Sequence, residues 1–318
     1  MIDLHLHLDG SLSLKSVRHL AQLQGESLPE DDQELLRHLS VTQRCRDLGE
    51  YLDKFDFPLA YLQTEEQLAS AAYCLKEELR EKGLIYAELR FSPQSHCRKG
   101  LTQEDAVRAV LAGCARSSFP GGLILCCMRG NQNEAANRET VRLAEKHLHR
   151  GVCAVDLAGA EALFPTKTYR DLFAMASSLG VPFTIHAGEA DGPESIRSAL
   201  SFGAKRIGHG VRACEDPSLL AELAESGVCL ELCPSSNLHT GVFSSYSAFP
   251  LRAFLDAGVR ITVNSDNMAV SHTDVFEEFR HLQNAFSLSG KTIRLLQTNA
   301  IEAAFAEEAE KQRLLRQI

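Results

Sequence analysis

The sequence lacks the features of several classes of protein. Its Lys and Arg residues form no basic cluster and the formal net charge is −9, which argues against nucleic acids and anionic membranes as partners, since both bind basic surfaces. No apolar run approaches the ~20 residues that span a bilayer. No linker or low-complexity segment divides the chain, and no two cysteines have the CxxC spacing of a thiolate zinc site.

The ten cysteines are scattered through the chain, without the spacing of a disulfide framework. No signal peptide is recognisable at the first residues. The composition, with 44 % hydrophobic and 24 % charged residues, is ordinary for a soluble globular protein. We therefore expect a soluble, cytoplasmic protein with free thiols. The sequence specifies no oligomeric state.

Short β-rich runs alternate with helical patterns along the 318 residues. The runs are Ile2–Leu8, Leu84–Phe91, Leu123–Met128, Val152–Leu157, Pro182–His186, Arg206–His209, Val228–Leu232 and Arg260–Asn264. Glycines precede most of them, as helix stops would: Gly83, Gly122, Gly151, Gly180, Gly203, Gly227 and Gly258. About eight such units in this length predict an α/β fold, a (β/α)8 TIM-type barrel. A doubly wound open sheet fits less well, because no GxGxxG loop follows the first run.

The connection between Ser11 and Glu81 contains several helical patterns and no strand. In a barrel it follows the first strand, so residues 11–81 would form a helical lid insertion over the mouth. Apolar side chains, including Tyr51 and Phe55, gather in one part of it; simple core packing is the alternative explanation for these. The whole chain, residues 1–318, is predicted as a single barrel domain with C-terminal helices.

Five short polar segments each close an apolar run. They are His5-Leu6-His7, His186-Ala187-Gly188-Glu189, Ile207-Gly208-His209-Gly210, Cys233-Pro234-Ser235-Ser236-Asn237 and Asn264-Ser265-Asp266-Asn267. Together they supply three histidines and an aspartate for a divalent metal, with a further histidine and a glutamate for proton transfer. These groups are what a metal-activated water and its acid–base partners require. In a barrel, the C-terminal ends of the strands form the face where catalysis is found.

His5 and His7 lie two residues apart in a strand, so their side chains share one face. That face is the barrel interior, where two imidazoles suit a metal; a hydrogen-bonded pair of polar histidines is the alternative. His186 ends another apolar run, where a buried imidazole needs a hydrogen bond or a metal.

Each of the other three residues has a functional and a structural reading. Glu189 follows a glycine in a loop and can reach back over the site, or it belongs to a surface loop. His209 lies between two glycines, which allow a ligand to approach closely, although a hydrogen-bonded histidine in a tight turn would look the same. Asp266 follows the last strand and supplies one anionic ligand, or it caps a helix.

Taken in order, these segments resemble the adenosine deaminases of the amidohydrolase superfamily. The resemblance also includes Asp9 and the segment Asp156-Leu157-Ala158-Gly159, and it extends from Met1 to about Phe305. It implies a mononuclear zinc enzyme on a β/α barrel. Such an enzyme would hydrolyse adenosine or 2′-deoxyadenosine to inosine or 2′-deoxyinosine plus ammonia, as part of purine metabolism.

The resemblance also implies a role for each residue. His5, His7, His186 and Asp266 would hold one Zn²⁺, although this set would also accept cobalt, iron or manganese. Glu189 would protonate N1 of the purine, and His209 would orient the attacking water and help deprotonate it. Gly159 would donate its N–H to N3, Asp9 would accept from the ribose 5′-hydroxyl, and Tyr51 and Phe55 would line the apolar lid.

One position departs from the pattern of the family. Many members carry a second acid directly after the metal-binding aspartate, which donates to N7 in its protonated form; here that residue is Asn267. An amide NH₂ donates without any change of protonation. Purine binding is therefore still expected, but adenosine is less firmly distinguished from a modified purine.

Other functions remain open on the sequence. A sister purine deaminase acting on adenine or aminodeoxyfutalosine would use the same catalytic groups. A metallohydrolase with two metals bridged by a lysine is disfavoured, because Val152–Gly159 contains no lysine. The cytidine-deaminase type of zinc site needs HxE and PCxxC, which are absent. A barrel that binds ligands without catalysis would not need the proton-transfer residues.

Overall fold

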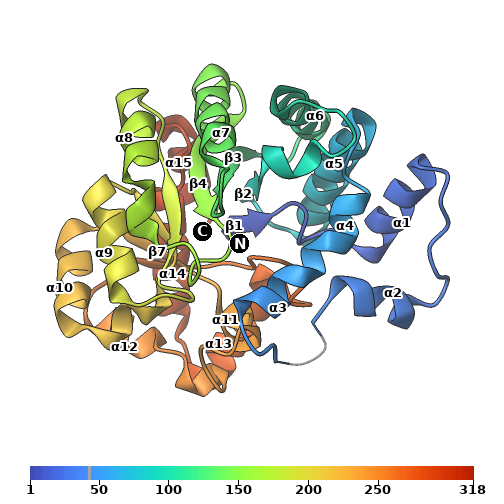
Figure 1. Cartoon of the computed structure of the whole chain (residues 1–318). Coiled ribbons are helices and arrows are strands. Elements are labelled where there is room, and N and C mark those ends of the chain that lie inside the picture. Colours follow the sequence, from blue (N-terminus) through green and yellow to red (C-terminus); the bar gives the residue numbers. More distant parts are fainter. Residues whose placement is uncertain (42–43) are drawn as a thin grey trace.

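Eight parallel strands alternate with helices in the computed structural model, which describes residues 1–41 and 44–318 (Figure 1). The strands are β1 (Ile2–His7), β2 (Tyr86–Phe91), β3 (Gly121–Met128), β4 (Val152–Ala158), β5 (Thr184–Ala187), β6 (Arg206–His209), β7 (Cys229–Leu232) and β8 (Ile261–Val263). All eight strands predicted from the sequence are confirmed, and their bounds differ by a few residues at most.

The strands pair in chain order and form a closed ring. β1 to β4 make one parallel sheet and β5 to β8 a second. The sheets meet where the N–H of Val155 donates to the carbonyl of Pro182 at 3.0 Å. On the opposite side, the N–H of His7 donates to the carbonyl of Asp266, and the N–H of Asp266 to that of His5, both at 2.8 Å. The predicted barrel is thus confirmed.

Helices surround the strands and cover their outer faces (Figure 1). They are α5 (Glu65–Lys82), α6 (Gln103–Ala115), α7 (Glu134–His147), α8 (Arg170–Ser178), α9 (Pro193–Phe202), α10 (Pro217–Ser226), α11 (Pro234–His239), α12 (Leu251–Asp256), α13 (Val275–Phe286), α14 (Gly290–Ala303) and α15 (Glu308–Leu315). Short 3₁₀ turns occupy Pro93–His96, Thr166–Tyr169, Val211–Glu215 and Tyr246–Ala248. Within the described residues, no helix has the length and apolarity needed to cross a membrane.

Glycines end three of these helices as predicted. Gly83, Gly203 and Gly227 are the C-caps of α5, α9 and α10, and all three have a left-handed backbone. The same prediction is wrong for Gly122, which lies inside β3. Helix α6 ends several residues earlier, so the chain has room to turn without a glycine at that point.

The segment after β1 forms the helices α1 (Leu14–Leu23), α2 (Asp32–Leu39), α3 (Leu48–Leu52) and α4 (Asp56–Ala60), with a 3₁₀ turn at Asp53–Phe55. They lie together on one side of the barrel, in blue in Figure 1. The lid predicted for residues 11–81 also includes residues 42–43, which lie outside the described part of the chain, and α5, which leads directly into β2.

Aromatic residues of this segment divide between the two predicted roles. Tyr51 and Phe55 line a cavity together with His7. Phe57 instead is half-buried and packs against the main hydrophobic core, and its ring stacks on that of His38. The lid and the core-packing readings therefore each describe part of the segment.

Strand residues alternate between the helices and the barrel interior. In β1, Ile2, Leu4 and Leu6 lie in apolar clusters, whereas Asp3 and His5 are buried polar side chains. Glu88, Arg90, Asp156 and Glu231 likewise have no exposed surface. Buried charges are tolerated only when they are paired and hydrogen-bonded. The barrel interior is accordingly a polar network, and it lies directly beneath the candidate site.

Candidate active site

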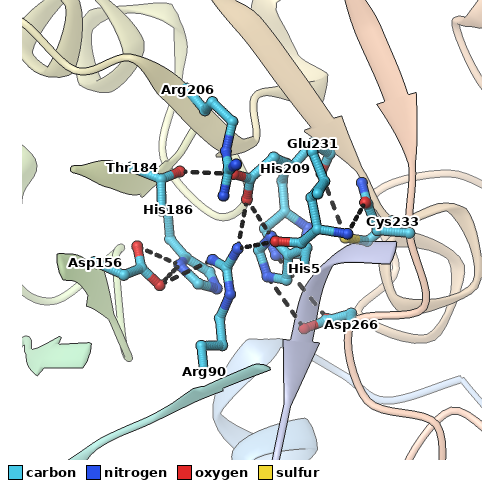
Figure 2. A network of polar contacts seen from close by, with 12 residues as sticks. His5, Arg90, Asp156, Thr184, His186, Arg206, His209, Glu231, Cys233 and Asp266 are labelled. Atoms are coloured by element: carbon cyan, nitrogen blue, oxygen red, sulfur yellow. Dashed lines mark hydrogen bonds and ion pairs between the residues drawn. The ribbon is translucent and has the colours of Figure 1, made fainter. Parts of the chain in front are cut away.

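Residues from four distant parts of the chain converge at the C-terminal ends of the strands. His5 and His7 come from β1, His186 from β5, His209 from the end of β6 and Asp266 from the residues after β8. Figure 2 shows His5, His186, His209 and Asp266 facing one another. One ligand atom from each of these four residues lies within 4.8 Å of the others.

His7 belongs to the same cluster. Its Nε2 lies 3.2 Å from Nε2 of His186 and 3.5 Å from Oδ1 of Asp266. Nε2 of His5 lies 3.4 Å from the same carboxylate oxygen. The structure therefore brings all five predicted residues together, with Nε2 of His209 4.0 Å from Oδ2 of Asp266.

Two carboxylates fix the rings of His5 and His186 from behind (Figure 2). Oε2 of Glu231 lies 2.7 Å from Nδ1 of His5, and Oδ2 of Asp156 lies 2.8 Å from Nδ1 of His186. A carboxylate that accepts the Nδ1 proton fixes the tautomer and leaves the Nε2 lone pair facing the site, an arrangement typical of metal-binding histidines.

A buried arginine joins the two carboxylates. Arg90 donates from Nη1 to Asp156 at 3.0 Å and from Nη2 to Glu231 at 2.9 Å. The sequence alone did not indicate a role for Arg90, Asp156 or Glu231. Two of them could have been recognised as charged residues in the middle of apolar strands, in Leu89-Arg90-Phe91 and Leu230-Glu231-Leu232. A charged residue between two apolar neighbours in a buried strand indicates a side chain that faces the barrel interior.

The side chains present fit a divalent metal. Nε2 of His5 is buried and has no hydrogen-bond partner, which is costly unless another group binds it. Burial lowers the pKa values of His7 and His186, so both imidazoles are neutral. Burial opposes ionisation of Asp266, but the imidazoles of His5, His209 and His7 around it hold its pKa well below the usual value. Neutral imidazoles and one carboxylate are ligands that zinc prefers.

Glu189 and His209 face each other beside this cluster. Oε2 of Glu189 lies 3.7 Å from Nε2 of His209. Burial and the negative charges of Asp266 and Glu161 raise the pKa of Glu189 well above its usual value. Burial lowers the pKa of His209 to about 3. At neutral pH the site thus offers a neutral imidazole and a carboxyl group that tends to keep its proton, as proton transfer requires.

Close packing and a strained backbone place these groups. A Cβ on Gly208 would lie 3.0 Å from Cε1 of His5 and 3.1 Å from Cα of His186, so a larger residue would push the imidazoles apart. His209 and Asp266 have φ angles of 58° and 61°, a left-handed conformation that is uncommon for residues other than glycine. Strain of this kind is found at functional sites, where the surrounding structure imposes it.

The cluster opens into a cavity of about 210 Å³. All of the predicted substrate-binding residues line it: Asp9, Tyr51, Phe55, Gly159 and Asn267. Burial raises the pKa of Asp9 to about 6. Tyr51 places its hydroxyl 2.8 Å from Oγ of Ser271.

Asn267 lies tightly against the backbone of the first loop. A Cβ on Gly10 would come within 1.9 Å of Oδ1 of Asn267, so only glycine leaves room for this amide. Its Oδ1 is buried and has no hydrogen-bond partner among the described residues, whereas its NH₂ group is the donor expected to face a purine.

A family model and a similar protein sequence both match this chain over its whole length. The sequence model of the family described as "Adenosine deaminase" matches residues 1–318. A protein of Haemophilus ducreyi named adenosine deaminase is 48 % identical, over 100 % of this chain and 95 % of that protein.

Two solved structures are similar across the whole barrel. One is adenine deaminase from Arthrobacter aurescens, with a TM-score of 0.89, 29 % identity and coverage of 99 % of this chain and 96 % of the other. The second is the N6-mAMP deaminase of Arabidopsis, with a TM-score of 0.86, 25 % identity and coverage of 98 % and 95 %. The three relatives are named for different purine substrates, so the cavity itself must distinguish among these.

Proposed function

Because the chain belongs to the adenosine deaminase family, we propose that it is a zinc-dependent enzyme that hydrolyses adenosine and 2′-deoxyadenosine. The products are inosine or 2′-deoxyinosine and ammonia, in purine salvage. The observation that carries the proposal is the buried pair of Glu189 and His209 beside a cluster of imidazoles and one carboxylate, at the base of a cavity.

We assign the metal to His5, His7, His186 and Asp266. When bound there, zinc supplies a Lewis acid that lowers the pKa of water from ~15.7 toward ~7. His209 is not assigned as a metal ligand, because its Nδ1 lies 3.2 Å from the amide nitrogen of Asn237. With the amide of Asn237 in this orientation, its NH₂ donates to Nδ1, so the imidazole proton is on Nε2, which in this tautomer does not bind a metal.

Glu189 is the proposed general acid. It donates its proton to N1 of the purine as the water oxygen bonds to C6, so negative charge does not accumulate on the ring. The amino group then takes the proton given up by the attacking water, the C6–N bond breaks, and ammonia leaves. The oxygen on C6 loses its remaining proton to Glu189 as the carbonyl forms, which restores the carboxyl group. The raised pKa of Glu189 supports this role, because the carboxyl group must be protonated when the substrate binds.

His209 is proposed to orient the attacking water by donating from Nε2. Its proposed share in deprotonating that water needs the other tautomer, with the proton on Nδ1. Asn237 would then have to turn its Oδ1 toward the ring, and this is the atom of Asn237 that is buried without a hydrogen-bond partner.

The remaining cavity residues are proposed to bind the nucleoside. Gly159 donates its N–H to N3, Asn267 donates from its NH₂ to N7, and Asp9 accepts from the ribose 5′-hydroxyl. Tyr51 and Phe55 cover the ring from the lid side.

The charge of the cavity favours a nucleoside over a nucleotide. Of the described residues that line it, none is Lys or Arg, whereas Asp9, Asp56 and Glu189 carry carboxyl groups. A 5′-phosphate, or the carboxylate of aminodeoxyfutalosine, would be buried there without a cation, which is unfavourable. Adenine has no ribose, so it would leave the part of the cavity beside Asp9 empty.

A substrate panel tests the proposal. Ultraviolet absorbance follows the deamination of adenosine, 2′-deoxyadenosine, adenine, AMP and aminodeoxyfutalosine by the zinc-loaded protein. We expect kcat/KM for adenosine to exceed that for AMP by roughly 100-fold or more, the cost of an unpaired buried charge. Faster turnover of adenine, AMP or aminodeoxyfutalosine than of adenosine would contradict the proposed substrate.

A further inference from the structure

A single buried carboxylate holds the loop that carries Glu189. Glu161 lies in the connection after β4 and has no exposed surface. It accepts backbone N–H groups from four consecutive residues: Gly188 at 2.7 Å, Glu189 at 3.0 Å, Ala190 at 2.7 Å and Asp191 at 3.0 Å. The hydroxyl of Ser195 donates to the same carboxylate at 2.5 Å.

These five donors fill the acceptor capacity of the group. A carboxylate offers about four lone-pair sites on its two oxygens. In the described chain, Glu161 makes no ion pair, so backbone dipoles and one hydroxyl are what stabilise its position. Successive N–H groups that converge on one anion form a concave binding site. Here the anion is part of the protein, and it fixes the backbone on both sides of Glu189.

A second set of contacts makes the same connection rigid. Arg129, which is 6 % exposed, donates to the carbonyls of His186 and Phe164, each at 2.6 Å, and to Oγ1 of Thr166 at 2.8 Å. Thr166 in turn lies 2.6 Å from Oγ of Ser195. The loop after β4 is therefore tied to both ends of the loop after β5.

We propose that Glu161 is a positioning residue, which holds the Glu189 carboxyl in its place beside His209 through these backbone hydrogen bonds. The inference rests on the proposed function, in which Glu189 is the general acid. Without the anion, four N–H groups would lose their acceptor in a buried region, and the loop would have to rotate to satisfy them. Glu189 would then move relative to the substrate, while the metal ligands remain on their strands.

The test uses Glu161→Gln, which keeps the size of the side chain but replaces one acceptor oxygen with a donor. We expect kcat for adenosine to fall by roughly 100-fold, the usual effect of an ångström-scale displacement. We expect KM to change by less than about threefold and the zinc content to stay at that of wild type, because neither the ligands nor the cavity walls are altered.

Asp216→Asn is the matched control. Asp216 also accepts two backbone N–H groups, from Ser218 at 2.9 Å and Leu219 at 3.3 Å at the start of α10, but it lines no part of the cavity. The Asp216→Asn substitution should lower the melting temperature and leave kcat unchanged. If Glu161→Gln likewise loses only thermal stability, its role is structural and the inference is wrong.

Hydrogen exchange keeps the inference testable if Glu161→Gln does not fold. In the wild-type protein, the amides of residues 188–191 should exchange as slowly as those of β5. Exchange at the rate of an open loop would overturn the inference. The two proposals fail in different ways: a wild-type enzyme without activity on adenosine contradicts the function, whereas an active wild type beside an equally active Glu161→Gln contradicts only the positioning role.

Discussion

Single residues of the site are held by partners that are absent from the described lining of the cavity. Glu231 and Asp156 lie behind His5 and His186, and Asn237 lies behind His209. Each imidazole thus has one nitrogen occupied and the other facing the site. Orientation of this kind raises metal affinity and sets which nitrogen carries the proton. The chemistry of the site depends on these partners as much as on the histidines.

Replacing the single residue Asn267 tests its proposed role as a donor to N7. We expect Asn267→Asp to keep its activity but to become more pH-dependent. A carboxyl group donates to N7 only when it is protonated, so the activity of the variant should fall as the pH rises through the pKa of the new group. The amide of the wild-type enzyme donates at every pH. Superimposable pH–rate profiles of kcat/KM for the two enzymes would contradict this role of Asn267.

The site residues near the strand ends could be predicted from the sequence, but the residues that hold them in place could not. The segments that hold His5, His186 and Asp266 each close a short apolar run, a pattern that is visible in the sequence. Arg90, Asp156 and Glu231 meet only because the register of three strands aligns them inside the barrel. Glu161 acts through backbone N–H groups, which leave no pattern of side chains to recognise.

Among the elements, α13 is joined to the start of α11 by a buried acid. Glu278 accepts the N–H of Ser235 at 3.1 Å and the hydroxyl of Thr273 at 2.7 Å. Burial raises the pKa of Glu278 from 4.5 to about 7. The folded protein therefore holds this proton more tightly than the unfolded chain does.

The prediction is that Glu278 makes the protein less stable as the pH rises. Its contribution to stability is fully present below pH 4.5 and is lost as the pH rises through about 7. A pKa difference of this size corresponds to roughly 3 kcal/mol. Urea unfolding at pH 5 and pH 8 should show that the wild type loses about this much relative to Glu278→Gln. Equal pH dependence of the two unfolding free energies would exclude the effect.

The arrangement of the short helices in the lid could not be predicted from the sequence. In residues 48–60 the structure has α3, a 3₁₀ turn and α4, rather than one continuous helix. Which aromatic faces the cavity depends on how these short pieces turn. Phe55 lines the cavity, while Phe57 stacks on His38. Helical periodicity could not assign the two rings, because Phe55 ends the 3₁₀ turn whereas Phe57 lies in α4, so no single helical repeat relates them.

For the whole molecule, barrel closure explains why residues as distant as His5 and Asp266 share one site. The backbone hydrogen bonds between them complete the ring of strands, so the same contacts close the barrel and bring these two residues together. The alternation of strands and helices was sufficient to predict this architecture, because parallel strands place all of their C-terminal ends on one face. The polar interior beneath that face required the three-dimensional pairing.

The most direct test of the account compares adenosine deamination by the wild-type enzyme and Glu189→Gln, with the zinc content of both measured. Glu194→Gln, a change at a side chain that is 90 % exposed, is the matched control and should behave as wild type. We predict rapid conversion of adenosine to inosine by the wild type. For Glu189→Gln, we predict a loss of roughly 10²- to 10⁴-fold in kcat at unchanged zinc content, the usual contribution of a general acid. Undiminished turnover by zinc-loaded Glu189→Gln, or no turnover by zinc-loaded wild type, would contradict the account.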